Sequence, residues 1–359
     1  MLQTRLAGVL SREHNNYDLL RLILATMVIW SHSFAIQPAI PRPDPLADYM
    51  LYGDSGSLAV TVFFVLSGLF VTDSMRVKRS VLDYLIMRTC RIFPGLLVCL
   101  VLTVLVVGPI FTTLPLAAYF RNPASLSYIT TNLALTNLQW RLPGVFADHA
   151  YGLNGSMWTL PTEVRLYLTL ALLHLTGAMT RRWTAVLAIG VSLALFLRFG
   201  HPPDPGVFRL AEAFSAGALL AVLKPFVPLS PIIAGALGLI AWGLAGTQFV
   251  AVPFYAAAAY TLLWAFSLPL MRRIRVFGDL SYGVYIYGFT VEQVFAHIFP
   301  AAAPPTNAAI SALVCWGLGA LSWMLIERPA LSFGRRLPPL ITSRIAATAR
   351  PTAISADRP

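Results

Sequence analysis

Long hydrophobic stretches recur along almost the whole chain and are separated by short polar segments. Most approach the roughly 20 residues that a helix needs to cross the hydrocarbon core of a bilayer, and they contain few charges. This pattern predicts an all-α, polytopic membrane protein with about ten transmembrane helices. The predicted spans are residues 19–36, 58–75, 92–113, 158–179, 183–199, 207–223, 231–245, 249–270, 281–299 and 308–326.

The composition excludes a soluble globular domain. Of the 359 residues, 57% are hydrophobic and 11% are charged, whereas a soluble domain carries roughly 25% charged residues. A soluble fold of this size could not cover its surface with so few polar side chains, but lipid solvates apolar surface directly.

Basic residues set the predicted orientation. The net charge of +11 is carried by short clusters in alternate loops, a pattern of membrane orientation rather than of a nucleic-acid-binding face. The richer loops contain Arg76, Lys78, Arg79, Arg88 and Arg91, then Arg181 and Arg182, then Lys224, then Arg272, Arg273 and Arg275. The opposite loops contain Arg42, Arg121 and Arg141. Both termini are therefore predicted to be cytoplasmic, in a multi-pass protein of the inner (plasma) membrane.

We expect one transmembrane domain over residues 1–335 and a disordered cytoplasmic tail over residues 336–359, which are rich in Pro, Ala and Arg. No metal or disulfide is expected, because Cys90, Cys99 and Cys315 show no ligand spacing. The histidines at positions 14, 149, 174, 201 and 297 show no recognisable spacing either.

Titratable side chains inside spans are candidates for function, since burying them in lipid is costly. Arg21 and His32 lie eleven residues apart in the first span, which is about three helical turns, or roughly 16 Å, and places them near one face. An imidazole can exchange a proton near neutral pH. His32 is therefore a candidate general base, or else a hydrogen-bonded core histidine.

Arg88 and Arg91, in the segment RTCRIFP, are three residues apart at the start of the third span. This spacing puts both guanidinium groups on one helix face, which suits phosphate or carboxylate recognition. Ordinary anchoring at the cytoplasmic boundary is the alternative interpretation.

A third group occupies the segment LNGSMWTLPTEVRLY, with Asn154, Trp158, Glu163 and Arg165. Glu163 is predicted either to face His32 from another helix or to form a local pair with Arg165. The polar, aromatic segment that precedes it, from about residue 114 to 157, is either a binding loop or a connector. Two further segments are GDLSYGVYIYG, which contains Tyr285 as a site or interfacial residue, and FFVLSG, whose small residues favour close helix packing.

In order along the chain, YDLLR followed by His32, FFVLSG, RTCRIFP, NGSMWTLPTEVRLY and GDLSYGVYIYGF resemble the acyltransferase-3 family of membrane-bound acyltransferases, in particular polysaccharide O-acetyltransferases. The resemblance runs from residue 17 to about residue 330. It implies transfer of an acyl group, usually acetyl, from cytoplasmic acetyl-CoA to a hydroxyl of a cell-surface polysaccharide or a lipid-linked sugar.

With this resemblance, the candidate residues take expected roles. His32 and Glu163 are catalytic, and Arg88, Arg91 and Arg21 hold the phosphates of coenzyme A. The substrate-binding candidates are Arg165, Trp158, Asn154 and Tyr285. No metal is required, since a thioester reacts with an activated hydroxyl.

Two other functions fit the same spans. A secondary transporter or flippase for a lipid-linked sugar would use His32, Glu163 and Arg165 to line a path. The cytoplasmic arginine pair and the absence of an inverted internal repeat favour the acyltransferase. A scaffold subunit without catalysis is the third hypothesis. The oligomeric state is not indicated.

Overall fold

Every regular element in the described part of the chain is a helix, which confirms the all-α class. The structure is a computed structural model that describes residues 5–37, 43–78, 80–199 and 205–337, so most of the predicted tail at 336–359 lies outside the described residues. The α-helices are α1 (Leu6–Val9), α2 (Tyr17–Ile36), α3 (Ser55–Lys78), α4 (Val81–Leu102), α5 (Gly108–Phe111), α6 (Leu116–Arg121), α7 (Pro123–Ala134), α8 (Leu160–Leu175), α9 (Arg182–Phe199), α10 (Pro205–Leu223), α11 (Pro231–Gly243), α12 (Ala251–Ala265), α13 (Pro269–Arg272), α14 (Ser281–Ile298) and α15 (Pro304–Ser322). Short 3₁₀ turns occupy Ala47–Tyr49 and Gly155–Thr159, and π-helical turns at Thr103–Val107 and Trp323–Glu327 extend α4 and α15.

Each predicted span coincides with a helix or a continuous helical run. Within the described residues, six helices are long and apolar enough to cross a membrane: Tyr17–Ile36, Ser55–Val77, Val81–Phe111, Arg182–Phe199, Gly206–Leu223 and Pro304–Leu337. α11 and α12 are apolar but shorter. The total of ten spans and the cytoplasmic position of both termini therefore stay predictions.

Helix boundaries follow local sequence signals. The Ser80 and Ser230 hydroxyls accept backbone N–H bonds at the start of α4 and α11, as N-cap residues do. Pro123, Pro231 and Pro304 occupy the first turns of α7, α11 and α15, where no N–H donor is needed.

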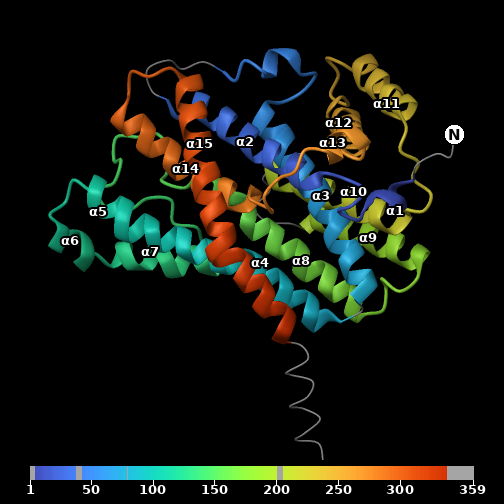
Figure 1. Cartoon of the computed structure of the whole chain (residues 1–359), viewed down its shortest axis with the longest axis horizontal. Coiled ribbons are helices and arrows are strands. Elements are labelled where there is room, and N and C mark those ends of the chain that lie inside the picture. Colours follow the sequence, from blue (N-terminus) through green and yellow to red (C-terminus); the bar gives the residue numbers. More distant parts are fainter. Residues whose placement is uncertain (1–4, 38–42, 79, 200–204, 338–359) are drawn as a thin grey trace, which may run out of the picture.

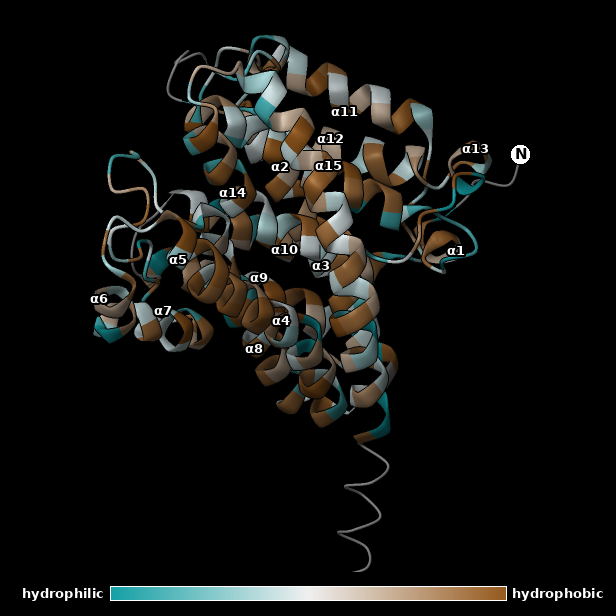
Figure 2. Ribbon diagram, turned by 60° about the vertical axis from the view of Figure 1, so that its left-hand side comes forward, coloured by the Kyte–Doolittle hydropathy of each residue, from teal (hydrophilic) through white to brown (hydrophobic). Residues whose placement is uncertain are grey.

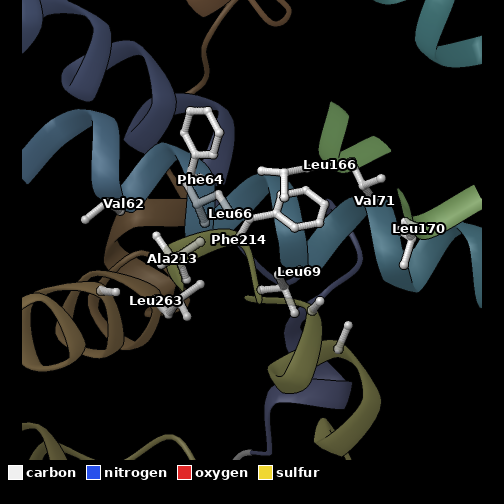
Figure 3. Close-up of a cluster of buried hydrophobic side chains, with 14 of the residues drawn as sticks. Val62, Phe64, Leu66, Leu69, Val71, Leu166, Leu170, Ala213, Phe214 and Leu263 are labelled. Carbon is white, nitrogen blue, oxygen red and sulfur yellow. The ribbon is translucent and has the colours of Figure 1, made fainter. Parts of the chain in front are cut away.

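α3 forms the centre of the bundle. Of its membrane-spanning window, 67% is buried, compared with 11% for α9. Around it, Leu66 and Leu69 pack with Leu166 of α8, Phe214 of α10 and Leu263 of α12 (Figure 3). α5, α6 and α7 lie together on one side of the molecule and α11 and α12 on the other (Figure 1). The ribbon of α4 is largely hydrophobic (Figure 2), as expected for a helix that faces lipid.

α3 and α10 approach each other so closely that neither has room for a side chain at the contact. A Cβ on Gly68 would collide with the carbonyl oxygen of Phe214, and one on Gly217 with that of Val65. The packing role predicted for FFVLSG is thereby confirmed for Gly68, since small residues allow helix backbones to approach in a membrane.

The segment between α7 and α8 returns into the bundle instead of staying at its surface. Asn154 is fully buried, and its Nδ2 donates a 3.1 Å hydrogen bond to the backbone oxygen of Ile286 in α14. Gly155 lies against the ring of Phe289, where a Cβ would come within 2.5 Å of a ring carbon. Irregular backbone at this depth is tolerated because protein surrounds it.

We expect Gly217→Ala to lower the stability of the purified protein by about 1–3 kcal/mol, because the added methyl group meets backbone atoms that cannot move aside independently. Thermal unfolding in detergent measures the effect. Gly235→Ala in α11 is the matched control, since nothing lies within 4 Å of the added Cβ. Equal melting temperatures for the two variants would contradict the close contact.

Candidate functional site

A cavity of about 460 Å³ lies between the N-terminal ends of α2, α4 and α14, the middle of α3 and the start of α8. This volume is within the range of small-molecule and cofactor sites. Its polar and charged lining consists of Arg12, Asn15, Tyr17, Asp18, Arg21, Ser67, Ser74, Arg88, Arg91, Thr159, Glu163, Tyr167, Asp279, Ser281, Tyr282 and Tyr285. The cavity thus collects all three predicted phosphate-binding arginines, together with Glu163 and Tyr285.

Arg91 is held in a buried ionic network. Its guanidinium donates to Asp279 at 2.7 Å and to Glu327, in the π-helical turn after α15, at 2.9 Å. Arg21 approaches the same Asp279 oxygen at 3.4 Å, and Ser281 donates to the other oxygen at 2.6 Å. One guanidinium therefore connects α4 with the start of α14 and the end of the α15 run.

Burial alone would raise the pKa of Asp279, but the charges of Arg91 and Arg21 outweigh it and hold the pKa at about 2. The Asp279 carboxyl group binds a proton more tightly in the unfolded chain than in the folded protein. The stabilisation that its ionised form gives to the fold is therefore complete above the ordinary pKa near 3.8 and is lost as the pH falls towards 2. Asp279 therefore stays ionised at physiological pH.

Arg88 differs from Arg91, although the two lie one helical turn apart. Its guanidinium carbon lies 5.8 Å from the ring centroid of Tyr167, within the range of a cation–π contact. Its Nε is buried without a hydrogen-bond partner, and no acidic side chain in the described part of the chain pairs with it. Arg91 thus has a structural role, whereas the guanidinium of Arg88 is available to a ligand.

Glu163 lies in the cavity and does not meet His32. Its carboxylate accepts a short hydrogen bond from the Tyr167 hydroxyl, and the Ser67 hydroxyl lies 3.5 Å from the same oxygen and 2.9 Å from the Tyr167 hydroxyl. Arg165 is exposed, because a residue two positions farther along α8 points to the opposite side of the helix. The structure therefore does not bring Glu163, Arg165 and His32 together.

The carboxylate beside His32 belongs to Glu292 of α14. His32 Nδ1 lies 3.5 Å from Glu292 Oε2, and neither atom has a hydrogen-bond partner among the described residues. Glu292 is fully buried, and its other oxygen accepts a 2.8 Å hydrogen bond from Ser33. Sequence analysis missed Glu292, although it is an acidic residue within a predicted span and satisfies the same criterion that selected His32.

Phe289 is the residue of α14 that packs against the ring of His32. Tyr285 lines the cavity, and Phe289 lies one turn farther along the same face of α14. The Phe289 ring contacts the His32 ring edge-to-face, with centroids 5.0 Å apart. His32 itself does not line the cavity.

The remaining predicted substrate residues have different environments. The Tyr285 hydroxyl pairs with Thr159 at 2.9 Å in the cavity wall. Asn154 anchors the returning segment to α14 and is closed to ligands. Trp158 packs, partly buried, against the core around α3. Of these three, Tyr285 alone lines the cavity.

Comparison with known proteins gives three matches. A family described as "Acyltransferase domain" matches residues 14–327. An "O-acetyl transferase" of Shigella phage Sf6 is 29% identical over 342 residues, covering 89% of this chain and 96% of the phage protein. "Nodulation protein 10" of Rhizobium leguminosarum bv. viciae is also 29% identical, over 372 residues, covering 89% of this chain and 94% of its own length. No solved structure matches.

We expect Arg91→Ala to destabilise the protein by about 3–5 kcal/mol, because it leaves the buried carboxylates of Asp279 and Glu327 without their shared cation. Arg88→Ala is the matched control, since no carboxylate depends on Arg88, and its cost should stay within about 1 kcal/mol. Thermal unfolding in detergent at pH 7 compares them. Similar losses in the two variants would show that Arg91 does not have the structural role described.

Proposed function

The chain belongs to the acyltransferase-3 family of membrane acyltransferases, and from this premise we propose that it moves an acetyl group from acetyl-CoA to a hydroxyl of a carbohydrate. Acyl transfer in a multi-pass membrane protein follows from the family. The donor, the acceptor and a position in the inner membrane are our proposal. The observation that carries it is the cavity between the helix ends, with an unpaired guanidinium in its wall.

Arg88 is the principal residue proposed to bind the donor. Its charge is not compensated by a neighbouring carboxylate, whereas Arg91 already has two such partners. A partly buried guanidinium in this state favours an anion with several oxygens, such as the phosphates of coenzyme A. Arg12, which is largely exposed beside Asp18, and Arg21 add positive charge to the same cavity.

In this proposal Glu163 acts in the cavity and not beside the imidazole of His32. Its carboxylate is oriented by Tyr167 and Ser67 and faces the space that the pantetheine arm of the donor would fill. A carboxylate there can accept a hydrogen bond from an amide N–H of that arm, which positions the thioester.

His32 is the proposed general base, with Glu292 as its positioning residue. The imidazole takes the proton from the acceptor hydroxyl as the hydroxyl oxygen attacks the thioester carbonyl carbon. The carbon–sulfur bond then breaks, and the leaving thiolate of coenzyme A takes the proton from the imidazolium, which returns His32 to its neutral form. Glu292 orients the ring and stabilises its protonated form, and their 3.5 Å separation can shorten when substrate binds.

The thioester must pass Phe289 to reach His32. Because this ring packs against the imidazole and lies one helical turn beyond Tyr285 of the cavity lining, the proposal requires the ring to turn or the returning segment at Gly155 to move. The acceptor would approach His32 from the other end of α2. The phage relative is named an O-acetyl transferase, which supports acetyl as the group transferred.

We expect His32→Ala to reduce acyl transfer by about 10²–10⁴-fold, the usual contribution of a general base, and Glu292→Gln to reduce it less. Membranes that contain each variant would be incubated with labelled acetyl-CoA, and acyl groups on surface carbohydrate would be measured by mass spectrometry. Glu212→Gln, at an exposed position of α10, is the control for the second change. Full acylation by His32→Ala would reject the catalytic role.

We expect Arg88→Ala to raise the apparent KM for acetyl-CoA by about tenfold or more with a smaller change in kcat, because one charge-assisted contact contributes roughly 1.5–3 kcal/mol. The exposed Arg181 provides the control substitution Arg181→Ala. An unchanged KM would remove the phosphate-binding role. A transporter, the competing function, would move a lipid-linked sugar without any labelled acyl group reaching carbohydrate.

A further inference from the structure

Three potential metal ligands meet at the C-terminal end of α14, whereas the cavity lies at the N-terminal end of this helix. Asp148 and His149 belong to the segment between α7 and α8, and His297 lies in the last turn of α14. One ligand atom from each residue lies within 4.8 Å of the others. The histidine spacing in the sequence gave no indication of this cluster, because His149 and His297 are 148 positions apart.

The ring of His149 is fixed in the tautomer that a metal ligand requires. Its Nδ1 lies 2.7 Å from Oε1 of Gln293, which is buried. The Gln293 amide nitrogen donates to the backbone oxygens of Gly152, at 2.9 Å, and Tyr151. Oε1 must therefore be the acceptor, Nδ1 carries the proton, and the Nε2 lone pair is free. Metal-bound histidines are typically held in this way by a second residue.

Aromatic side chains restrict both imidazoles. Phe146 stacks on His149, with centroids 4.9 Å apart and planes inclined by 18°, and also contacts His297 at 4.9 Å. Phe111 contacts His297 at 5.6 Å from another side. Within the described part of the chain, neither nitrogen of His297 is engaged in a hydrogen bond, so both remain available as ligands.

We propose that Asp148, His149 and His297 bind one divalent transition-metal ion of the zinc class. Two imidazoles and one carboxylate are a typical set for Zn²⁺, and they leave a fourth position for water. Mg²⁺ and Ca²⁺ prefer oxygen ligands alone. The bound ion would fasten the returning segment to the end of α14, outside the acyl-transfer cavity, so the site is independent of the proposed catalytic function.

The test uses the purified full-length protein in detergent, stripped with a chelator and titrated with Co²⁺ as a spectroscopic probe and with Zn²⁺ as a competitor. The proposal predicts one Co²⁺ per chain with the intense visible absorption of tetrahedral coordination, displaced by Zn²⁺. His149→Ala and His297→Ala should each weaken binding by at least 100-fold. Gln293→Leu should weaken it by about 10–100-fold, as loss of a supporting residue does.

His14→Ala is the matched control, since His14 is exposed and bonded to Ser11 elsewhere in the chain, and it should bind Co²⁺ as the unaltered protein does. His297 is also exposed, so its substitution should preserve the fold, which the metal-free melting temperature would verify. Absence of Co²⁺ binding, or binding that survives the double variant His149→Ala/His297→Ala, would overturn the proposal. Because no acyl donor is present, neither result depends on acyltransferase activity.

Discussion

The guanidinium of Arg91, buried between two carboxylates, is the interaction on which the site depends. It connects α4 to the start of α14 and to the end of the α15 run, and through Asp279 it reaches Arg21 on α2. These helices form the walls of the cavity. Removing Arg91 would leave two carboxylates buried without a cation, and removing the carboxylates would leave the guanidinium buried without an anion. The network therefore holds the cavity walls together. It also engages Arg91, which is then not free to bind a ligand.

Arg88 and Arg91 belong to the same short sequence motif, but they make different contacts. Spacing places Arg88 and Arg91 on one helix face, but only tertiary structure supplies Asp279 and Glu327 to one of them. Arg88, whose Nε has no hydrogen-bond partner among the described residues, is the residue that we propose binds the phosphates of the donor. His32, by contrast, belongs to a second compartment, where Glu292 and Ser33 define its surroundings.

Hydropathy was sufficient to locate the longer apolar helices, because the bilayer imposes a length and a composition on each span. It did not predict the helices α1, α6 and α7. It identified segments for α11 and α12, although these helices are shorter than the usual span. The motifs and the titratable residues in the spans selected Arg21, Glu163 and Tyr285 as site candidates; the structure places all three in the lining of one cavity, and their roles stay predictions. Sequence analysis could not predict that Glu292, rather than Glu163, faces His32, since residues 260 positions apart meet only through helix packing. The same limit hid the cluster of Asp148, His149 and His297, because neither local spacing nor periodicity encodes such a meeting.

Gly155 limits the space in which the Phe289 ring can move. Its backbone occupies the space that a side chain would otherwise take beside Phe289, so the aromatic ring can swing in that direction only when the chain around Gly155 withdraws. Displacing the segment that contains Gly155 would therefore free the ring, so the packing of one loop controls how far an aromatic side chain beside the imidazole can move.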